Sequence, residues 1–181
     1  MRVTPTEIAE VLILEPTVFT DERGFFLESY NRRTLREATG IDPDFVQDNH
    51  SRSARNVLRG LHYQIRRPQG KLVRVTSGEI WDVAVDLRAS SATFGRWVAF
   101  VLDARSPRSV WIPAGFAHGF LVLSEVADVQ YKTTDYYARE HERTLLWNDP
   151  ALAIPWPLNG APVMAEKDRH GAPLAAAERF A

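Results

Sequence analysis

Apolar and polar residues alternate through much of the chain beyond residue 58, which is the pattern of short β-strands. In Ile80–Leu87, a tryptophan, two valines and a leucine take every second position, and two aspartates and an alanine lie between them. This period of two places the two sets on opposite faces of a strand. Further short strands are predicted at Lys71–Thr76, Trp97–Leu102, Ser109–Ile112, Gly119–Leu123 and Asp128–Thr134. Short strands separated by turn residues favour an all-β antiparallel sandwich or jelly roll.

Helices are predicted at only two places. Asn31 is a suitable N-cap for a short helix through Thr39, with Gly40 as its stop. The second predicted helix is Pro173–Phe180, at the end of the chain. The sequence contains no internal repeat, low-complexity tract or linker, so residues 1–181 are predicted to form one domain.

Composition narrows the functional classes. The 181 residues are 45% hydrophobic, enough for a substantial core, and the formal net charge of -1 argues against a nucleic-acid partner. The absence of cysteine excludes disulfides and thiolate metal sites. Met1–Glu10 lacks the apolar core of a secretory signal, and no apolar run approaches the roughly 20 residues of a membrane span. We therefore expect a soluble, cytoplasmic protein that does not act at a membrane.

The segment Arg59–Lys71 holds the most informative chemistry. Histidine is the side chain best suited to act as a base near neutral pH, so His62 is a candidate base, although a strand histidine is more often structural. If Lys71 points inward, its ammonium could stabilise negative charge on a ligand oxygen. Strict alternation places Arg59 on the opposite face from His62, so a shared site requires a β-bulge near Gly60.

Carboxylates and phenols elsewhere in the chain could complete such a site. A histidine base needs a carboxylate that fixes its tautomer, and the sequence offers two candidates, Asp82 and Asp168. Tyr131 shares its strand face with a valine and a threonine, so its phenol either packs in the core or supplies a proton. Tyr136 and Tyr137 could offer a plane on which a base stacks.

A metal site is not expected. Pro113–Phe120 contains a Pro-x-Gly-x-x-His turn that resembles the second signature of cupin barrels, where the histidine, here His118, often binds a metal. The first cupin signature normally supplies His-x-His and a glutamate, but the corresponding segment is His62–Gln64. Two histidines without a clear carboxylate form a poor site for zinc or iron.

Other polar residues are candidates for binding a nucleotide. Arg23, Arg59 and Lys167 could hold phosphates, for which the bidentate arginine fork is well suited. Gln47 and Asn49 carry both hydrogen-bond donors and acceptors, as the edge of a pyrimidine requires.

Considered together, these segments resemble the dTDP-4-dehydrorhamnose 3,5-epimerase family. The resemblance runs in order from Val3 to Asp168 and is more specific than any single motif. It is carried by Phe19–Phe26, Phe45–Ser51, Val57–Gln64, Gln69–Arg74, Asp82–Arg88, Trp111–Phe120, Tyr131–Tyr137, Trp147–Pro150 and Lys167–Asp168.

The resemblance implies a cupin-type jelly roll (a double-stranded β-helix) with a few short helices, acting as a homodimer without metal or organic cofactor. The implied substrate is dTDP-4-dehydro-6-deoxy-D-glucose and the implied product dTDP-4-dehydro-L-rhamnose, in dTDP-L-rhamnose biosynthesis. His62 would be the base, oriented by Asp168, with Lys71 stabilising an enolate oxygen and Tyr131 donating a proton from the opposite face.

The same resemblance assigns ten residues to substrate binding: Arg23, Glu28, Gln47, Asp48, Asn49, Arg59, His118, Tyr137, Glu142 and Lys167. Some of them are expected to reach across the dimer. Three alternatives remain open at this point. The chain could invert only one carbon of a related ketosugar, it could be a metal-dependent cupin, or it could be a binding module without catalysis, against which the intact His62, Lys71 and Tyr131 argue.

Overall fold

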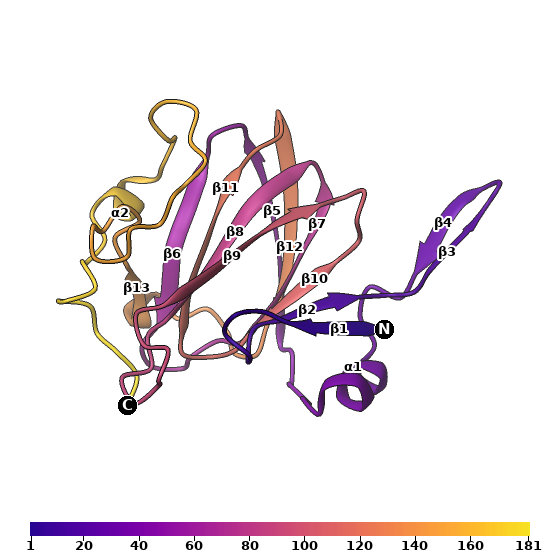
Figure 1. The fold of residues 1–181 in the computed structure, drawn as a ribbon, viewed down its shortest axis with the longest axis horizontal. Helices are drawn as coiled ribbons and strands as arrows, with labels where there is room; N and C mark the ends of the chain where they lie inside the picture. Colours follow the sequence, from indigo (N-terminus) through magenta and orange to yellow (C-terminus); the bar gives the residue numbers. More distant parts are fainter.

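Two antiparallel β-sheets lie face to face in the computed structural model, which describes all residues from Met1 to Ala181 (Figure 1). The larger sheet has, in order, the strands β1 (Arg2–Pro5), β2 (Leu12–Glu15), β10 (Ser109–Ile112), β7 (Lys71–Ser77), β12 (Val126–Thr133) and β5 (Gln47–Ala54). The smaller sheet has β13 (Glu142–Thr144), β6 (Leu58–Gln64), β11 (Phe116–Val122), β8 (Glu79–Asp86) and β9 (Trp97–Asp103). This arrangement confirms the predicted all-β jelly roll.

A third, two-stranded element stands apart from the sheets. The hairpin of β3 (Val18–Asp21) and β4 (Gly24–Leu27) projects away from the two-sheet body (Figure 1). Three of its aromatic side chains are largely exposed: Phe19, Phe25 and Phe26. Exposed aromatic clusters on a projecting element mark an interaction surface more often than a free surface.

The two largest clusters of the hydrophobic core lie on opposite faces of the smaller sheet, which is covered on both sides. On β8, Ile80 and Ala84 point between the sheets, whereas Val83 and Val85 point to the outer face. Residues after β13, including Leu152 and Trp156, pack over that outer face. The period of two predicted for this strand is therefore confirmed, and burial on both faces explains why so many positions are apolar.

The predicted N-terminal helix is confirmed and the C-terminal one is wrong. Helix α1 spans Arg32–Thr39; the Asn31 side chain accepts a hydrogen bond from the Thr34 N–H at 3.1 Å, and Gly40 ends the helix in the left-handed region. Residues 173–180 instead form turns, and Phe180 pairs with Arg88 in a β-bridge. Bridging uses the backbone groups that a helix would need, so the contact with the body of the fold overrides the local propensity.

Two further short elements lie near the C-terminus, a 3₁₀ turn at Arg139–His141 and the one-turn helix α2 at Glu166–Arg169. None of the helices is long and apolar enough to cross a membrane.

Candidate active site

A polar cleft of about 260 Å³ opens between the two sheets. Its lining contains all four side chains predicted to do the chemistry: His62, Lys71, Tyr131 and Asp168. Five of the ten predicted binding residues also line it: Arg59, His118, Tyr137, Glu142 and Lys167.

A β-bulge brings Arg59 and His62 to the same face of β6. Arg59 pairs with Phe120 and His62 with His118, so β6 advances three residues while β11 advances two. Gly60 lies in this irregular segment with φ of +112°, and a Cβ there would come within 2.7 Å of the neighbouring β11 backbone. Glycine is therefore required at this position, and the bulge that a shared site demanded is present.

His62 is held by Asp168 and not by Asp82. The Nε2 atom of His62 lies 2.6 Å from the Asp168 carboxylate, which also accepts the Gly60 N–H at 3.3 Å. Burial acts to raise the pKa of Asp168, but the hydrogen bonds from His62 and Gly60 outweigh it and lower the pKa below its ordinary value. An ionised Asp168 requires the proton on Nε2, which leaves Nδ1 as the basic nitrogen of a neutral His62 ring.

Asp82 belongs to a second His–Asp pair. Its Oδ2 atom lies 2.9 Å from Nε2 of His118, and both side chains are buried. Burial lowers the pKa of His118, against the opposing charge and hydrogen bond of Asp82, so this ring is neutral near pH 7. The other carboxylate oxygen of Asp82 is buried without a hydrogen-bond partner.

Lys71 is a buried residue rather than a solvated strand-end lysine. It is 7% exposed, and its ammonium donates to the backbone carbonyl of His62 at 3.3 Å. Burial lowers the pKa of Lys71 to about 8, even though the charges of Asp82 and Glu142 act to raise it. The cleft therefore holds a cation that is close to its titration point at neutral pH.

Tyr131 enters the cleft from the larger sheet, opposite the strands that carry the histidines. Its neighbours in alternation on β12, Val129 and Thr133, are buried between the sheets, as the period of two predicted. Burial raises the pKa of Tyr131, so the phenol keeps its proton at neutral pH.

Glu142 connects two other residues at the mouth of the cleft. It accepts a hydrogen bond from Nζ of Lys167 at 2.7 Å and one from the Tyr137 hydroxyl at 3.1 Å. Burial acts to raise the pKa of Glu142, but the hydrogen bond and charge of Lys167 lower it overall. The predicted position of Glu142 in the site is consistent with this geometry.

Gln64 is a cleft residue that the sequence analysis missed. Its side-chain amide donates to the carbonyls of Arg67 at 2.8 Å and Tyr136 at 3.2 Å, and accepts the Ala138 N–H at 2.7 Å. These bonds fasten the segment that carries Tyr137 to β6. Because all three bonds are to backbone atoms of distant or turn residues, no motif in the sequence identifies them.

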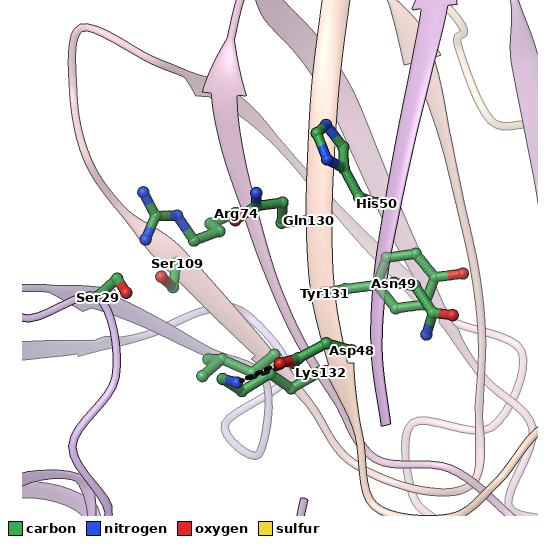
Figure 2. Close-up of a pocket in the computed structure, with 10 residues that line it drawn as sticks. Ser29, Asp48, Asn49, His50, Arg74, Ser109, Gln130, Tyr131 and Lys132 are labelled. Carbon is green, nitrogen blue, oxygen red and sulfur yellow. Dashed lines mark hydrogen bonds and ion pairs between the residues drawn. The ribbon is translucent and has the colours of Figure 1, made fainter. Parts of the chain in front are cut away.

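Gln47, Asp48 and Asn49 begin strand β5, and the alternation of the strand divides their side chains between two faces. Figure 2 shows Asn49 and Tyr131 pointing to one side of the sheet and Asp48 and Lys132 to the other. Asp48 accepts a hydrogen bond from Nζ of Lys132 at 2.8 Å on the outer face, so it does not line the cleft of its own chain, and its role in nucleotide binding stays a prediction.

Gln47 reaches the cleft only indirectly. Its side chain donates to the Asn49 side chain at 2.8 Å and accepts the Tyr137 N–H at 3.0 Å. Gln47 and Asn49 therefore face the side of Tyr131 without lining the cleft, and Gln47 helps to hold Tyr137 in place.

Arg23 and Glu28 lie outside the cleft of their own chain. Arg23 is at the exposed turn of the β3–β4 hairpin and pairs with Asp21 at 2.5 Å. Glu28 follows the hairpin and accepts a hydrogen bond from Asn31 at 2.9 Å. A single chain does not bring either residue to His62.

The outer face of the larger sheet carries a separate polar groove of about 340 Å³ (Figure 2). Arg74, Ser109, Gln130 and Lys132 contribute to it. It lacks the combination of base, acid and buried cation that the cleft has.

No group of three or more His, Cys, Asp or Glu side chains is arranged to hold a metal ion. His62 and His118, which occupy the positions of the two cupin signatures, are each hydrogen-bonded to an aspartate.

The two-sheet architecture with a polar cleft between the sheets defines a cupin-type jelly roll. The family model described as dTDP-4-dehydrorhamnose 3,5-epimerase matches residues 5–176, and the chain belongs to this family of isomerases. The resemblance inferred from the motifs is thereby confirmed.

Individual relatives agree with this assignment. The dTDP-4-dehydrorhamnose 3,5-epimerase of Pseudomonas aeruginosa is 62% identical over 180 residues, covering 99% of each chain. A crystal structure of the Legionella pneumophila epimerase in complex with dTDP-4-keto-L-rhamnose matches with a TM-score of 0.95 and 50% identity, covering 98% of this chain and 94% of that one. A 3'-monoepimerase from Streptomyces bikiniensis in complex with dTDP-quinovose matches with a TM-score of 0.89 and 34% identity, covering 94% and 87%.

Proposed function

We propose that this protein inverts C3 and C5 of dTDP-4-dehydro-6-deoxy-D-glucose to give dTDP-4-dehydro-L-rhamnose. The observation that supports this most directly is the cleft itself. A histidine paired with a carboxylate and a protonated phenol enter it from opposite sheets, with a buried lysine beside the histidine. Inversion at carbon needs a base on one face of the ring and an acid on the other.

The chemistry follows from the ketone at C4 of the substrate. A carbonyl acidifies the hydrogens on the adjacent carbons, so Nδ1 of His62 can remove one as a proton and leave an enolate. The ammonium of Lys71 stabilises the enolate oxygen, and its enclosed position makes that interaction stronger than it would be in water. The hydroxyl of Tyr131 then returns a proton to the other face of the carbon, and water reprotonates the phenolate.

Neither step changes an oxidation state, so the reaction proposed here needs no cofactor. Proton transfers between carbon, His62, Tyr131 and water balance without another reactant. The remaining cleft residues fit binding roles for the nucleotide: Arg59 and Lys167 for the diphosphate, Tyr137 for stacking on thymine, and His118 and Glu142 for contacts at the sugar end and the cleft mouth.

A homodimer would explain the predicted residues that lie outside the cleft. Arg23 lies in the projecting hairpin and Glu28 directly follows it, and three aromatic side chains of the hairpin are exposed in one chain. If this hairpin packs on a second copy, its polar residues can reach the partner's nucleotide site. The Asp48 side chain, which points to the outer face, can contact a nucleotide only in the site of the second copy.

Subunit complementation tests the dimer. Mixed subunits of R23A and H62A contain one site in which both substitutions are absent, provided that Arg23 acts across the dimer. Recovery of activity on mixing two inactive variants supports this role, and no recovery with a measured mass of one chain would reject it.

We propose one domain over residues 1–181 and a cytoplasmic location, where nucleotide sugars are made. No nucleic-acid or membrane partner is proposed, since the net charge is -1 and no basic excess is present.

The decisive experiment is hydrogen exchange from D2O into the thymidine-linked ketosugar, followed by NMR at C3 and C5. Deuterium at both carbons together with the L-rhamnose configuration supports the double inversion. Label at C3 alone favours a monoepimerase, the second candidate, because the chain is also similar to a 3'-monoepimerase. Retention of full activity in EDTA would argue against a metal-dependent cupin.

A further inference from the structure

Asp82 is a buried carboxylate that has no part in the proposed proton transfers. It is 0% exposed and lies on the inner face of β8, between the sheets. One oxygen accepts a hydrogen bond from His118 at 2.9 Å, and the other is buried without a hydrogen-bond partner. An unpaired buried carboxylate oxygen is costly, so a compensating charge nearby is expected.

Lys71 provides such a charge from the facing sheet. Its ammonium has three N–H donors, of which only one, to the His62 carbonyl, is used within the chain. Burial acts to lower the pKa of Lys71, and the negative charge of Asp82 is the largest influence in the opposite direction, ahead of Glu142. The two groups also belong to one cluster, because the Lys71 ammonium is bonded to the His62 carbonyl, His62 lies opposite His118 on the neighbouring strand, and His118 is bonded to Asp82. Asp82 and Lys71 form no direct salt bridge, so Asp82 acts on the lysine through its charge.

We propose that Asp82 is a positioning residue that keeps the Lys71 ammonium protonated inside the cleft and holds the His118 ring in one tautomer. This inference rests on the proposed function, because a neutral lysine cannot stabilise an enolate oxygen electrostatically. Since the Nε2 proton of His118 is directed to Asp82, Nδ1 of His118 is left as a hydrogen-bond acceptor for a hydroxyl of the sugar.

The proposal predicts how the pH dependence of activity changes when the Asp82 charge is removed. Loss of the Asp82 charge lowers the pKa of Lys71, so the lysine loses its proton at a lower pH and the alkaline limb of activity moves down. Two carboxylates act on the charge of Lys71: Asp82, which is fully buried, and Glu142 on β13, which is only partly buried. The other titratable side chains that line the cleft are Arg59, His62, Tyr63, His118, Tyr131, Tyr137, Lys167 and Asp168.

The pKa of Lys71 can be measured without substrate, because the chain has only three lysines. Protein labelled with ¹³C-lysine gives three Cε signals, K71Q identifies the one from Lys71, and those of Lys132 and Lys167 serve as internal references. In D82N the Lys71 midpoint is expected to fall by about one pH unit, the lower end of the effect of a close opposite charge. D82E keeps the charge and is expected to restore the midpoint.

D128N is a matched control for general effects of removing a buried carboxylate. Asp128 is 5% exposed but lies on the outer face of the larger sheet, where it pairs with Arg52 at 2.9 Å. The Lys71 midpoint is expected to stay at its wild-type value in this variant. Should D82N fail to fold, D82S removes the same charge in a smaller side chain.

Measurements of activity give a second test of the role of Asp82. In D82N the alkaline limb of C–H exchange should move down with the Lys71 midpoint, whereas in a K71Q background, which has no lysine to titrate at this position, D82N should not shift the alkaline limb. An unchanged Lys71 midpoint in a folded D82N or D82S variant overturns the inference. Absence of exchange in the wild-type protein would instead reject the proposed function, and the NMR titration would still decide the role of Asp82.

Discussion

His62–Asp168 and His118–Asp82 are two His–Asp pairs whose histidines face each other on the neighbouring strands β6 and β11. The His62 side chain is 26% exposed to the cleft, whereas the His118 side chain is 7% exposed. The carboxylate of the first pair comes from the C-terminal helix α2 and that of the second from β8, an interior strand of the smaller sheet. The same two residue types thus occur at the open side and at the floor of one site.

Exposure and surroundings separate the roles of the two pairs. Asp168 is fully hydrogen-bonded and its pair is open to a ligand, which suits a base that must take up a proton. Asp82 has one oxygen without a hydrogen-bond partner, and its negative charge acts on the buried ammonium of Lys71. These features suit a group that sets the charge of another residue in the cleft. A His–Asp pair therefore does not identify a catalytic base until its accessibility is known.

Removal of His62 is the strongest way to test this contrast. H62A is expected to reduce kcat by about 10⁴-fold, near the upper end of the range for general acid–base groups, while dTDP binding persists because the nucleotide contacts are made by other residues. Isotope exchange and calorimetric titration with dTDP measure the two effects. H50A is a suitable control, because His50 lies on the outer face and pairs with Asp128. Turnover in H62A comparable to the wild-type rate would refute the assignment.

Substitution of Asp168 should have the next largest effect. D168N removes the charge that fixes the His62 tautomer, and we expect kcat to fall by about 10²-fold with little change in dTDP affinity. The rate is measured as exchange at C3 and C5. If D168N and wild type exchanged at equal rates, the distinction between the two pairs would lose its basis.

Tyr131 tests whether the acid stands on the face opposite His62. In Y131F, proton removal does not need the phenol, so inversion is expected to be impaired about 10-fold more than exchange of the substrate hydrogen. Measuring product configuration and deuterium uptake in the same sample gives both values. Equal losses in the two assays would contradict the role of Tyr131 as the acid.

The lowered pKa of Lys71 predicts a moderate loss of activity at high pH. Because the Lys71 pKa is about 8 and the ammonium is the active form, exchange should fall as the pH rises through that value. At one pH unit above the pKa, about a tenth of the activity should remain. The arginine in K71R keeps its charge throughout this pH range, so the residual activity of this variant should not fall as the pH rises. A fall at high pH that persists in K71R would be caused by the titration of another group.

The smallest effects are expected on the edge strand β5. Asn49 faces the side of Tyr131, whereas Asp48 makes a solvent-exposed ion pair with Lys132, of the kind that contributes about 0–1 kcal/mol. N49A should raise KM several-fold and D48A should change it less than about twofold. Steady-state kinetics of the two variants decides between them. A larger effect of D48A would indicate that the outer face contacts the substrate through a second copy.

Much of the architecture could be predicted from local pattern. The alternation in residues 80–87 and the caps at Asn31 and Gly40 depend only on neighbouring residues, so the strand and the helix that they predict are both present in the structure. The Pro173–Phe180 helix failed because its outcome depends on the distant strand segment around Arg88, with which Phe180 pairs. The choice of a helix or a bridge there is made by partners that a local window does not contain.

The sequence by itself determined the family and the chemical groups of the candidate site, because residue types and their order suffice for both. Only the tertiary structure decided which aspartate meets which histidine, that a bulge at Gly60 turns Arg59 toward His62, and that Asp48 points outward. These outcomes depend on register and on contacts between residues up to about a hundred positions apart, as in the separation of 106 between His62 and Asp168. Burial, which sets the charge of Lys71 and separates the two His–Asp pairs, likewise exists only once the sheets have packed.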